Sequence, residues 1–190
     1  MTLPSEKIIA ETRAWVDRAV IGLNLCPFAK AVQVKGLVRY VVSEATDTAM
    51  LLADLHIELQ GLGDADPAKL DTTLLIHPYV LTDFIDFSYF LPAADRVLKT
   101  LGLTGTLQIA NFHPEYQFAD TKADDVTNAT NCSPYPTLHL LREASIDRAV
   151  AAFPNAEAIY ANNMRTLDAL GKDGWEKLRE QCRRDAFGDD

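Results

Sequence analysis

Cysteine is scarce in this 190-residue chain, and the cysteines present are spaced too widely for a disulfide framework. Cys26, Cys132 and Cys182 are odd in number and form no C-x-x-C pair. This usage is typical of reduced thiols and gives no support to redox chemistry.

Basic residues are also few, because 18 Lys and Arg face 27 Asp and Glu and leave a formal net charge of -9. Surfaces that bind nucleic acid or anionic membranes need clustered Lys and Arg, so the composition argues against both partners. No stretch is apolar and long enough to span a bilayer, and residues 1–6 show no cationic segment followed by an apolar run. We therefore expect a cytoplasmic protein, and the sequence leaves its oligomeric state open.

The chain does contain apolar, strand-like runs that alternate with helical stripes of leucine. Residues 37–43, 74–77 and 103–112 read as strands. Between the first two runs, a helical stripe is formed by Leu51, Leu52, Leu55, Leu59 and Leu62. Asp83 is placed to cap a helix before the third run. From Thr137 onwards we predict helices only, over about 137–153, 155–170 and 175–183.

This order predicts an α/β fold. We expect a single domain over residues 1–190, with a small, mainly parallel sheet built from successive β-α-β units and flanked by helices. The C-terminal third is predicted to be helical, with a frayed tail at about 186–190.

The segment from Pro114 to Pro136 shows neither helical nor strand periodicity and is longer than most connections in compact domains. Its aromatic residues, prolines and asparagines favour an ordered loop that covers the site, although the polar stretch 120–128 would also fit a disordered loop.

Three of the four histidines lie where a pocket is expected. His77 and His113 end apolar strands, and parallel strands bring their carboxyl ends to one edge of the sheet, where ligands bind. We predict catalysis by His113 as general acid or base, assisted by His139 and Tyr116. Ser43 or Tyr116 would relay a proton or orient the substrate, and His77 would complete the pocket wall. A His-Pro pair at a strand end is also common as a purely structural boundary.

An anion site is predicted beside these histidines. His139, Arg142 and Glu143 fall in the expected first turns of a helix, and free N–H groups together with a guanidinium bind carboxylates or phosphates. Asn131 and Ser133 precede this helix and would contact the same ligand. The leading expectation is thus an enzyme that acts on a small anionic molecule without a cofactor; a solvated ion pair between Arg142 and Glu143 is the structural alternative.

Two other classes of function stay open. His77, His113, His139 and Glu44 would be acceptable ligands for zinc or another divalent ion, although no H-E-x-x-H or H-x-H spacing is present. Alternatively, the chain is a non-catalytic module that recognises a partner through Tyr116, Phe118 and Tyr135. A nucleophilic Cys26 is disfavoured by its place after a helix C-terminus, and no base is evident beside Cys132.

Several motifs in order also resemble a known family. The segments are NLCPFA (24–29), LLIHP (74–78), FHPEYQF (112–118) and SPYPTLHLLRE (133–143), and the likeness extends over roughly residues 15–170. They resemble a bacterial family of about this size that is catalogued as a domain of unknown function. The resemblance implies no particular activity, cofactor or partner. It implies that a basic residue is more usual at position 132, which weakens a catalytic role for Cys132 and removes one possible anion contact.

Overall fold

The computed structural model describes residues 3–153, 155 and 158–188. Its elements, in chain order, are α1 (Ser5–Trp15), the π-helix η1 (Val16–Ile21), α2 (Ala29–Val34), β1 (Val38–Val42), α3 (Thr48–Asp64), β2 (Thr72–Ile76), α4 (Phe84–Thr100), β3 (Leu107–Phe112), the 3-10 helix η2 (Val126–Thr130), β4 (Thr137–Arg142), α5 (Glu143–Ala152) and α6 (Ala158–Phe187). None of the helices in the described ranges is long and apolar enough to cross a membrane.

The four strands form one sheet in the order β1-β2-β4-β3. β1 pairs with β2 in parallel, whereas β4 is antiparallel to both of its neighbours. Consequently β1, β2 and β3 run in the same direction. Strand β4 lies between β2 and β3 and runs in the opposite direction. The predicted α/β class, with one sheet flanked by helices and a helical C-terminal region, is confirmed. The sheet is mixed and not mainly parallel, because β4 lies between β2 and β3 and pairs with both in the antiparallel sense.

The segment 137–142 corrects the predicted helix over 137–153. It is strand β4, and the helix begins only at Glu143. A short apolar run such as Leu138 to Leu141 fits a buried strand as well as a helix. Here the free backbone groups of β2 and β3 on either side decide in favour of the strand, which places Leu138 and Leu140 on one face and His139 on the other.

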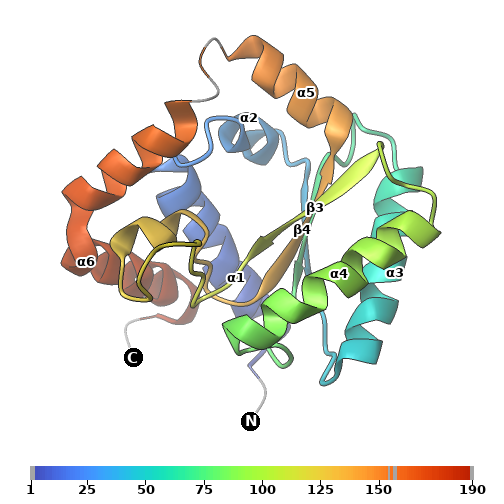
Figure 1. The fold of residues 1–190 in the computed structure, drawn as a ribbon, viewed down its shortest axis with the longest axis horizontal. Helices are drawn as coiled ribbons and strands as arrows, with labels where there is room; N and C mark the ends of the chain where they lie inside the picture. The colour runs from blue at the N-terminus through green and yellow to red at the C-terminus, as the bar shows by residue number, and fades with distance from the viewer. Residues whose placement is uncertain (1–2, 154, 156–157, 189–190) are drawn as a thin grey trace.

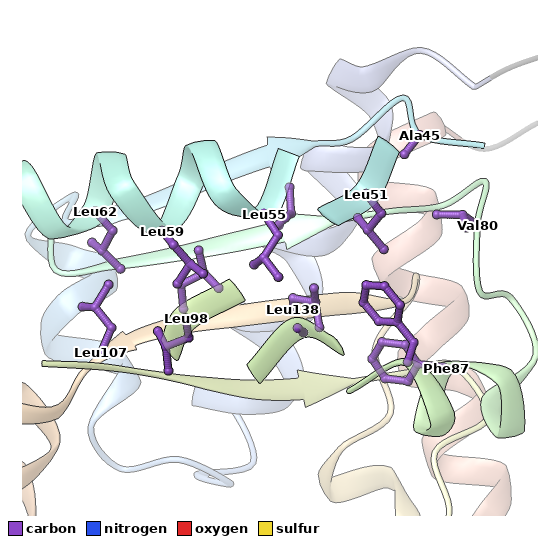
Figure 2. Packing of buried hydrophobic residues seen from close by; sticks show 14 residues of the cluster. Ala45, Leu51, Leu55, Leu59, Leu62, Val80, Phe87, Leu98, Leu107 and Leu138 are labelled. Atoms are coloured by element: carbon purple, nitrogen blue, oxygen red, sulfur yellow. The ribbon is translucent and has the colours of Figure 1, made fainter. Parts of the chain in front are cut away.

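Helices α3 and α4 cover the first face of the sheet (Figure 1). Four leucines of the predicted α3 stripe are fully buried there, whereas Leu52 is partly buried. Figure 2 shows the four, Leu51, Leu55, Leu59 and Leu62, along one side of the helix. Asp83 caps α4 as predicted, because its Oδ1 accepts the N–H groups of Ile85 and Asp86. Apolar burial on this face supplies the main core.

Helices α1 and α6 lie on the second face of the sheet (Figure 1). The separate helices predicted over about 155–170 and 175–183 correspond to the two parts of α6, which meet at a kink at Gly171, where φ is 69° and ψ is 171°. Helix α6 continues to Phe187, so the predicted frayed tail does not start at 186; Asp189 and Asp190 lie outside the described residues. Trp15, Leu74, Leu167 and Trp175 are buried in this second cluster.

The π-helix η1 makes Gly22 necessary. Its N–H bonds to Asp17 O at 3.0 Å, and a Cβ at this position would lie 2.2 Å from Arg18 O. Gly22→Ala is therefore expected to lower the free energy of unfolding by about 1–3 kcal/mol. Gly61→Ala, in α3 with nothing within 4 Å of an added Cβ, is expected to raise it by up to about 1 kcal/mol. Urea denaturation of both variants measures the difference, and equal effects would contradict the proposed backbone clash.

Candidate functional site

The structure brings Ser43, His77 and His113 to the carboxyl edge of the sheet, on the face covered by α3 and α4. Ser43 continues β1 by donating its N–H to Ile76 O at 2.8 Å, and its hydroxyl donates to Asp54 Oδ2 of α3 at 2.5 Å. The rings of His77 and His113 both pack against Phe87 of α4, with ring centroids 5.5 and 5.3 Å away. Ser43, His77 and His113 therefore lie at the same edge of the sheet, as the common direction of β1, β2 and β3 predicted.

His77 is fully buried and neutral. Its Nδ1–H donates to Val80 O at 3.0 Å, because a carbonyl can only accept. Nε2 consequently carries a lone pair, and it has no hydrogen-bond partner among the described residues. Burial lowers the pKa of His77 to about 4.

His113 uses both of its ring nitrogens. Nδ1 accepts the N–H of Glu115 at 3.0 Å, and Nε2–H donates to Leu81 O at 3.2 Å. Burial lowers the pKa of this side chain also. In this arrangement neither nitrogen is free to exchange a proton with a substrate, so the geometry does not favour the general acid or base role expected of His113.

His139 lies on the second face, in the middle of β4, and not at a helix start. Its Nε2–H donates to Thr72 Oγ1 at 2.7 Å, since that hydroxyl itself donates to Leu140 O. The Phe112 ring lies 5.8 Å away, and burial lowers the pKa of His139 to about 4. The sheet therefore separates His139 from His77 and His113.

The metal alternative loses its ligand set for the same reason. Glu44 at the end of β1 is exposed and accepts a hydrogen bond from Ser5 Oγ at 3.2 Å. Within the part of the chain that the structure describes, no group of three or more His, Cys, Asp or Glu is placed to hold a metal ion. His77, His113, His139 and Glu44 do not converge.

Arg142 ends β4 at the opposite edge of the sheet, paired with Leu107. Its guanidinium is buried and donates to the carbonyls of Leu62 at 2.7 Å, Ala65 at 2.8 Å and Leu70 at 3.2 Å. These carbonyls belong to the last turn of α3 and the segment that follows it, where the helix dipole favours a cation. The anion site predicted at Arg142 is therefore wrong, because this side chain already serves as a C-cap.

The 114–136 loop is built around Asn128. The Asn128 Oδ1 accepts from Phe118 N and Thr121 Oγ1, and its Nδ2 donates to Lys122 O at 2.8 Å. Three aromatic residues of the loop, Tyr116, Phe118 and Tyr135, are half-buried. The Tyr116 ring packs against the rings of Phe84 and Phe118, and the Tyr135 hydroxyl donates a hydrogen bond to Glu11 Oε2 at 2.5 Å. They do not form the exposed flat patch that partner binding would require.

Two adjoining hollows lie between this loop and α6, with volumes of about 370 and 310 Å³. Both are lined by Cys132, Trp175, Glu176 and Arg179. Trp15 and the predicted Ser133 line the first hollow only, and the predicted Tyr116 lines the second only. Asn131, also predicted, lines neither hollow, and its Nδ2 donates to Asn111 O at 3.4 Å. Burial raises the pKa of Tyr116.

Charges of both signs line the hollows. Arg179 and Arg183 line the first together with Glu11, Glu176 and Glu180. Arg179 and Lys172 line the second, where Arg179 Nη1 is 3.1 Å from Glu176 Oε1 and Lys172 Nζ is 2.6 Å from Asp124 Oδ2. A ligand that presents both an anionic and a cationic or hydroxyl group would match these walls better than a simple anion.

Sequence reasoning missed the α6 contribution. Trp175, Arg179 and Arg183 follow each other at intervals of four residues, which places them on one helical face. This spacing was the available signal, but a charged helical stripe ordinarily indicates a solvated surface.

The two thiols in the first hollow are protonated at neutral pH. Burial raises the pKa of Cys132 to about 11 and that of Cys182 to about 11 as well. Since the thiolate is the nucleophilic form, neither thiol is activated for nucleophilic catalysis.

Comparison with known proteins gives a family but no activity. Searches of curated proteins and of solved structures each found no significant match. The model of a family described as a protein of unknown function (DUF1415) matches residues 7–177, and the chain therefore belongs to this family.

Proposed function

We propose that the protein binds a small molecule with an anionic group in the two adjoining hollows between α6 and the 114–136 loop. The observation that carries this proposal is the shared wall. Arg179 and Trp175 border both hollows, so one ligand could contact a guanidinium and an indole ring wherever it enters. Their volumes of about 370 and 310 Å³ suit a metabolite-sized ligand.

The ligand class follows from the lining. Arg179 offers a planar pair of donors for a carboxylate or phosphate, and Arg183 offers a second guanidinium in the first hollow. Glu11 and Glu180 on the same wall favour a ligand that also carries an amino or hydroxyl group. The proposal is for binding; histidine acid-base catalysis is not part of it, because none of the three predicted histidines lines either hollow.

Tryptophan fluorescence tests the proposal directly. Both tryptophans of the chain, Trp15 and Trp175, line the first hollow, so the intrinsic emission reports on this site. We would titrate the protein with inorganic phosphate, citrate, glutamate and a set of neutral amino acids. At least one probe is expected to give a saturable change, strongest among those that carry charges of both signs.

A matched pair of arginine variants assigns the response. Arg179→Gln removes the shared cation and is expected to weaken probe binding about 10- to 100-fold. Arg165→Gln, at an exposed position in the first half of α6, is expected to bind as the wild type does. A flat response to every probe, or equal affinity in the Arg179 variant, would overturn the proposal.

A further inference from the structure

The turn that follows β3 forms one wall of the second hollow, through Pro114, Glu115 and Tyr116. His113 accepts two hydrogen bonds from this turn. Its Nδ1 accepts the N–H of Glu115 at 3.0 Å, and its backbone carbonyl accepts the N–H of Tyr116 at 3.1 Å. The position of the wall therefore depends on a lone pair at His113 Nδ1.

The other side of the His113 ring is also fixed. Nε2–H donates to Leu81 O, and Leu81 lies in the left-handed region at φ 57°, which non-glycine residues rarely adopt. The ring packs against Phe84 and Phe87, with centroid distances of 5.4 and 5.3 Å. These contacts leave a single neutral tautomer, with the proton on Nε2.

Two carboxylates and a second histidine lie around this ring. Glu115 of the same turn and Asp83 at the start of α4 favour its protonation. His77, which follows β2 and packs against the same Phe87 ring, has its own protonation disfavoured by a charge on His113. The Asp83 carboxylate is occupied as the α4 cap. The two carboxylates thus attract a proton toward a ring whose hydrogen bonds require the neutral form.

We propose that protonation of His113 is a switch that opens the second hollow and lowers its affinity for the ligand. A proton taken from solvent onto Nδ1 replaces the lone pair by a donor that points at the Glu115 N–H. Two donors cannot bond to each other, so the turn must move and carry Pro114, Glu115 and Tyr116 away from α6. This inference rests on the proposed ligand site for its functional meaning, but the switch itself is a property of the ligand-free protein.

The direction of the pH effect follows from burial. Burial lowers the pKa of His113 below the ordinary value of 6.5, so the neutral, closed form dominates at pH 7 and above. The open form becomes populated only as the pH falls below that range. One pH unit below the His113 midpoint, ligand affinity is expected to be about tenfold weaker.

The first experiment uses the ligand-free wild type. Heteronuclear NMR spectra recorded from pH 7.5 to 4.5 are expected to show the Nε2–H tautomer of His113 at high pH. The Glu115 amide signal is expected to shift with the same midpoint as the His113 ring. A Glu115 amide that ignores the His113 titration would overturn the switch, whatever the outcome of the ligand screen.

Two variants then separate the two hydrogen bonds. His113→Asn keeps an acceptor near the Nδ1 position and cannot be protonated, so its glutamate affinity, read by tryptophan fluorescence, is expected to lose the His113 step in pH. His113→Gln keeps a donor toward Leu81 but loses the acceptor, so weak binding is expected at every pH. The carboxylates of the hollow are common to all three proteins, and an Asn variant with the pH profile of the wild type would refute the switch. If glutamate does not bind the wild type at all, the proposed function fails in this respect while the NMR result still decides the switch.

Discussion

Arg142→Met is expected to lower the free energy of unfolding by about 3–5 kcal/mol. Methionine keeps the long aliphatic stem but removes the guanidinium that donates to the carbonyls of Leu62, Ala65 and Leu70. These carbonyls are left without their partner at a helix end, and the favourable contact of a cation with the α3 dipole is lost as well. No effect on ligand binding is expected, because Arg142 lines neither hollow.

The matched control is Arg148→Met in α5, whose exposed guanidinium donates to Ser145 Oγ at 2.9 Å and to no other group among the described residues. Its loss should change stability by less than about 0.5 kcal/mol. Denaturant unfolding at pH 7.5 compares the two variants with the wild type. Should Arg142→Met be no less stable than the control, the capping role assigned to this arginine would be wrong.

Lowering the pH is expected to reduce the free energy of unfolding, and this is the second large effect that we predict. The pKa of His77 is about 4 in the folded state, compared with 6.5 for an unperturbed side chain. Between these values the unfolded chain binds a proton that the folded chain does not, so stability rises with pH through this window. Its contribution is fully present above pH 6.5 and is lost as the pH falls toward 4. At pH 4.5 the loss from His77 alone is about 2–3 kcal/mol, and His139, with a pKa also of about 4, acts in the same direction.

Denaturant unfolding at pH 7.5 and 4.5 measures this loss. His77→Phe retains the packing against Phe87 and cannot titrate, so it is expected to be less sensitive to acid than the wild type by about 2–3 kcal/mol, although it is less stable at pH 7.5 without the bond to Val80 O. His56→Phe, on the exposed side of α3, should keep the acid sensitivity of the wild type. An unchanged pH dependence in His77→Phe would show that this ring is not the group that titrates.

Much of the fold was predictable because local pattern and tertiary structure agree there. The α3 leucines fall on one helical face, and Asp83 has the side chain that an N-cap requires. Strand β4 was not predictable, because Thr72 pairs with Leu141 across a long stretch of chain and no local feature of residues 137–142 encodes that register. Because residues 137–142 form a strand and not the predicted helix, Arg142 and His139 do not form the expected anion site.

The candidate site divides in the same way. Strand direction predicted that His77 and His113 would share an edge with Ser43, and they do. The carbonyls that hold the two rings, Val80 and Leu81, belong to an irregular turn whose conformation no periodicity reveals. The hollows depend on α6 packing against the loop. The predicted residues Ser133 and Tyr116 lie in their walls, whereas Arg179 of α6 was not predicted.

The place of β4 within the sheet also sets an order for assembly. Strands β1 and β2, with α3 between them, are contiguous in sequence and can pair as soon as residue 76 has been made. Strand β3 lies at the edge of the sheet and, within the described ranges, pairs with no strand except β4. A nascent chain that ends before residue 137 therefore exposes the unpaired backbone of β2 and β3 together, and such unpaired strands are the ones that associate with other chains. Strand β4 is synthesised last and pairs with both β2 and β3. We therefore expect the risk that these strands associate with other chains to fall only after Arg142, the last residue of β4, has been incorporated.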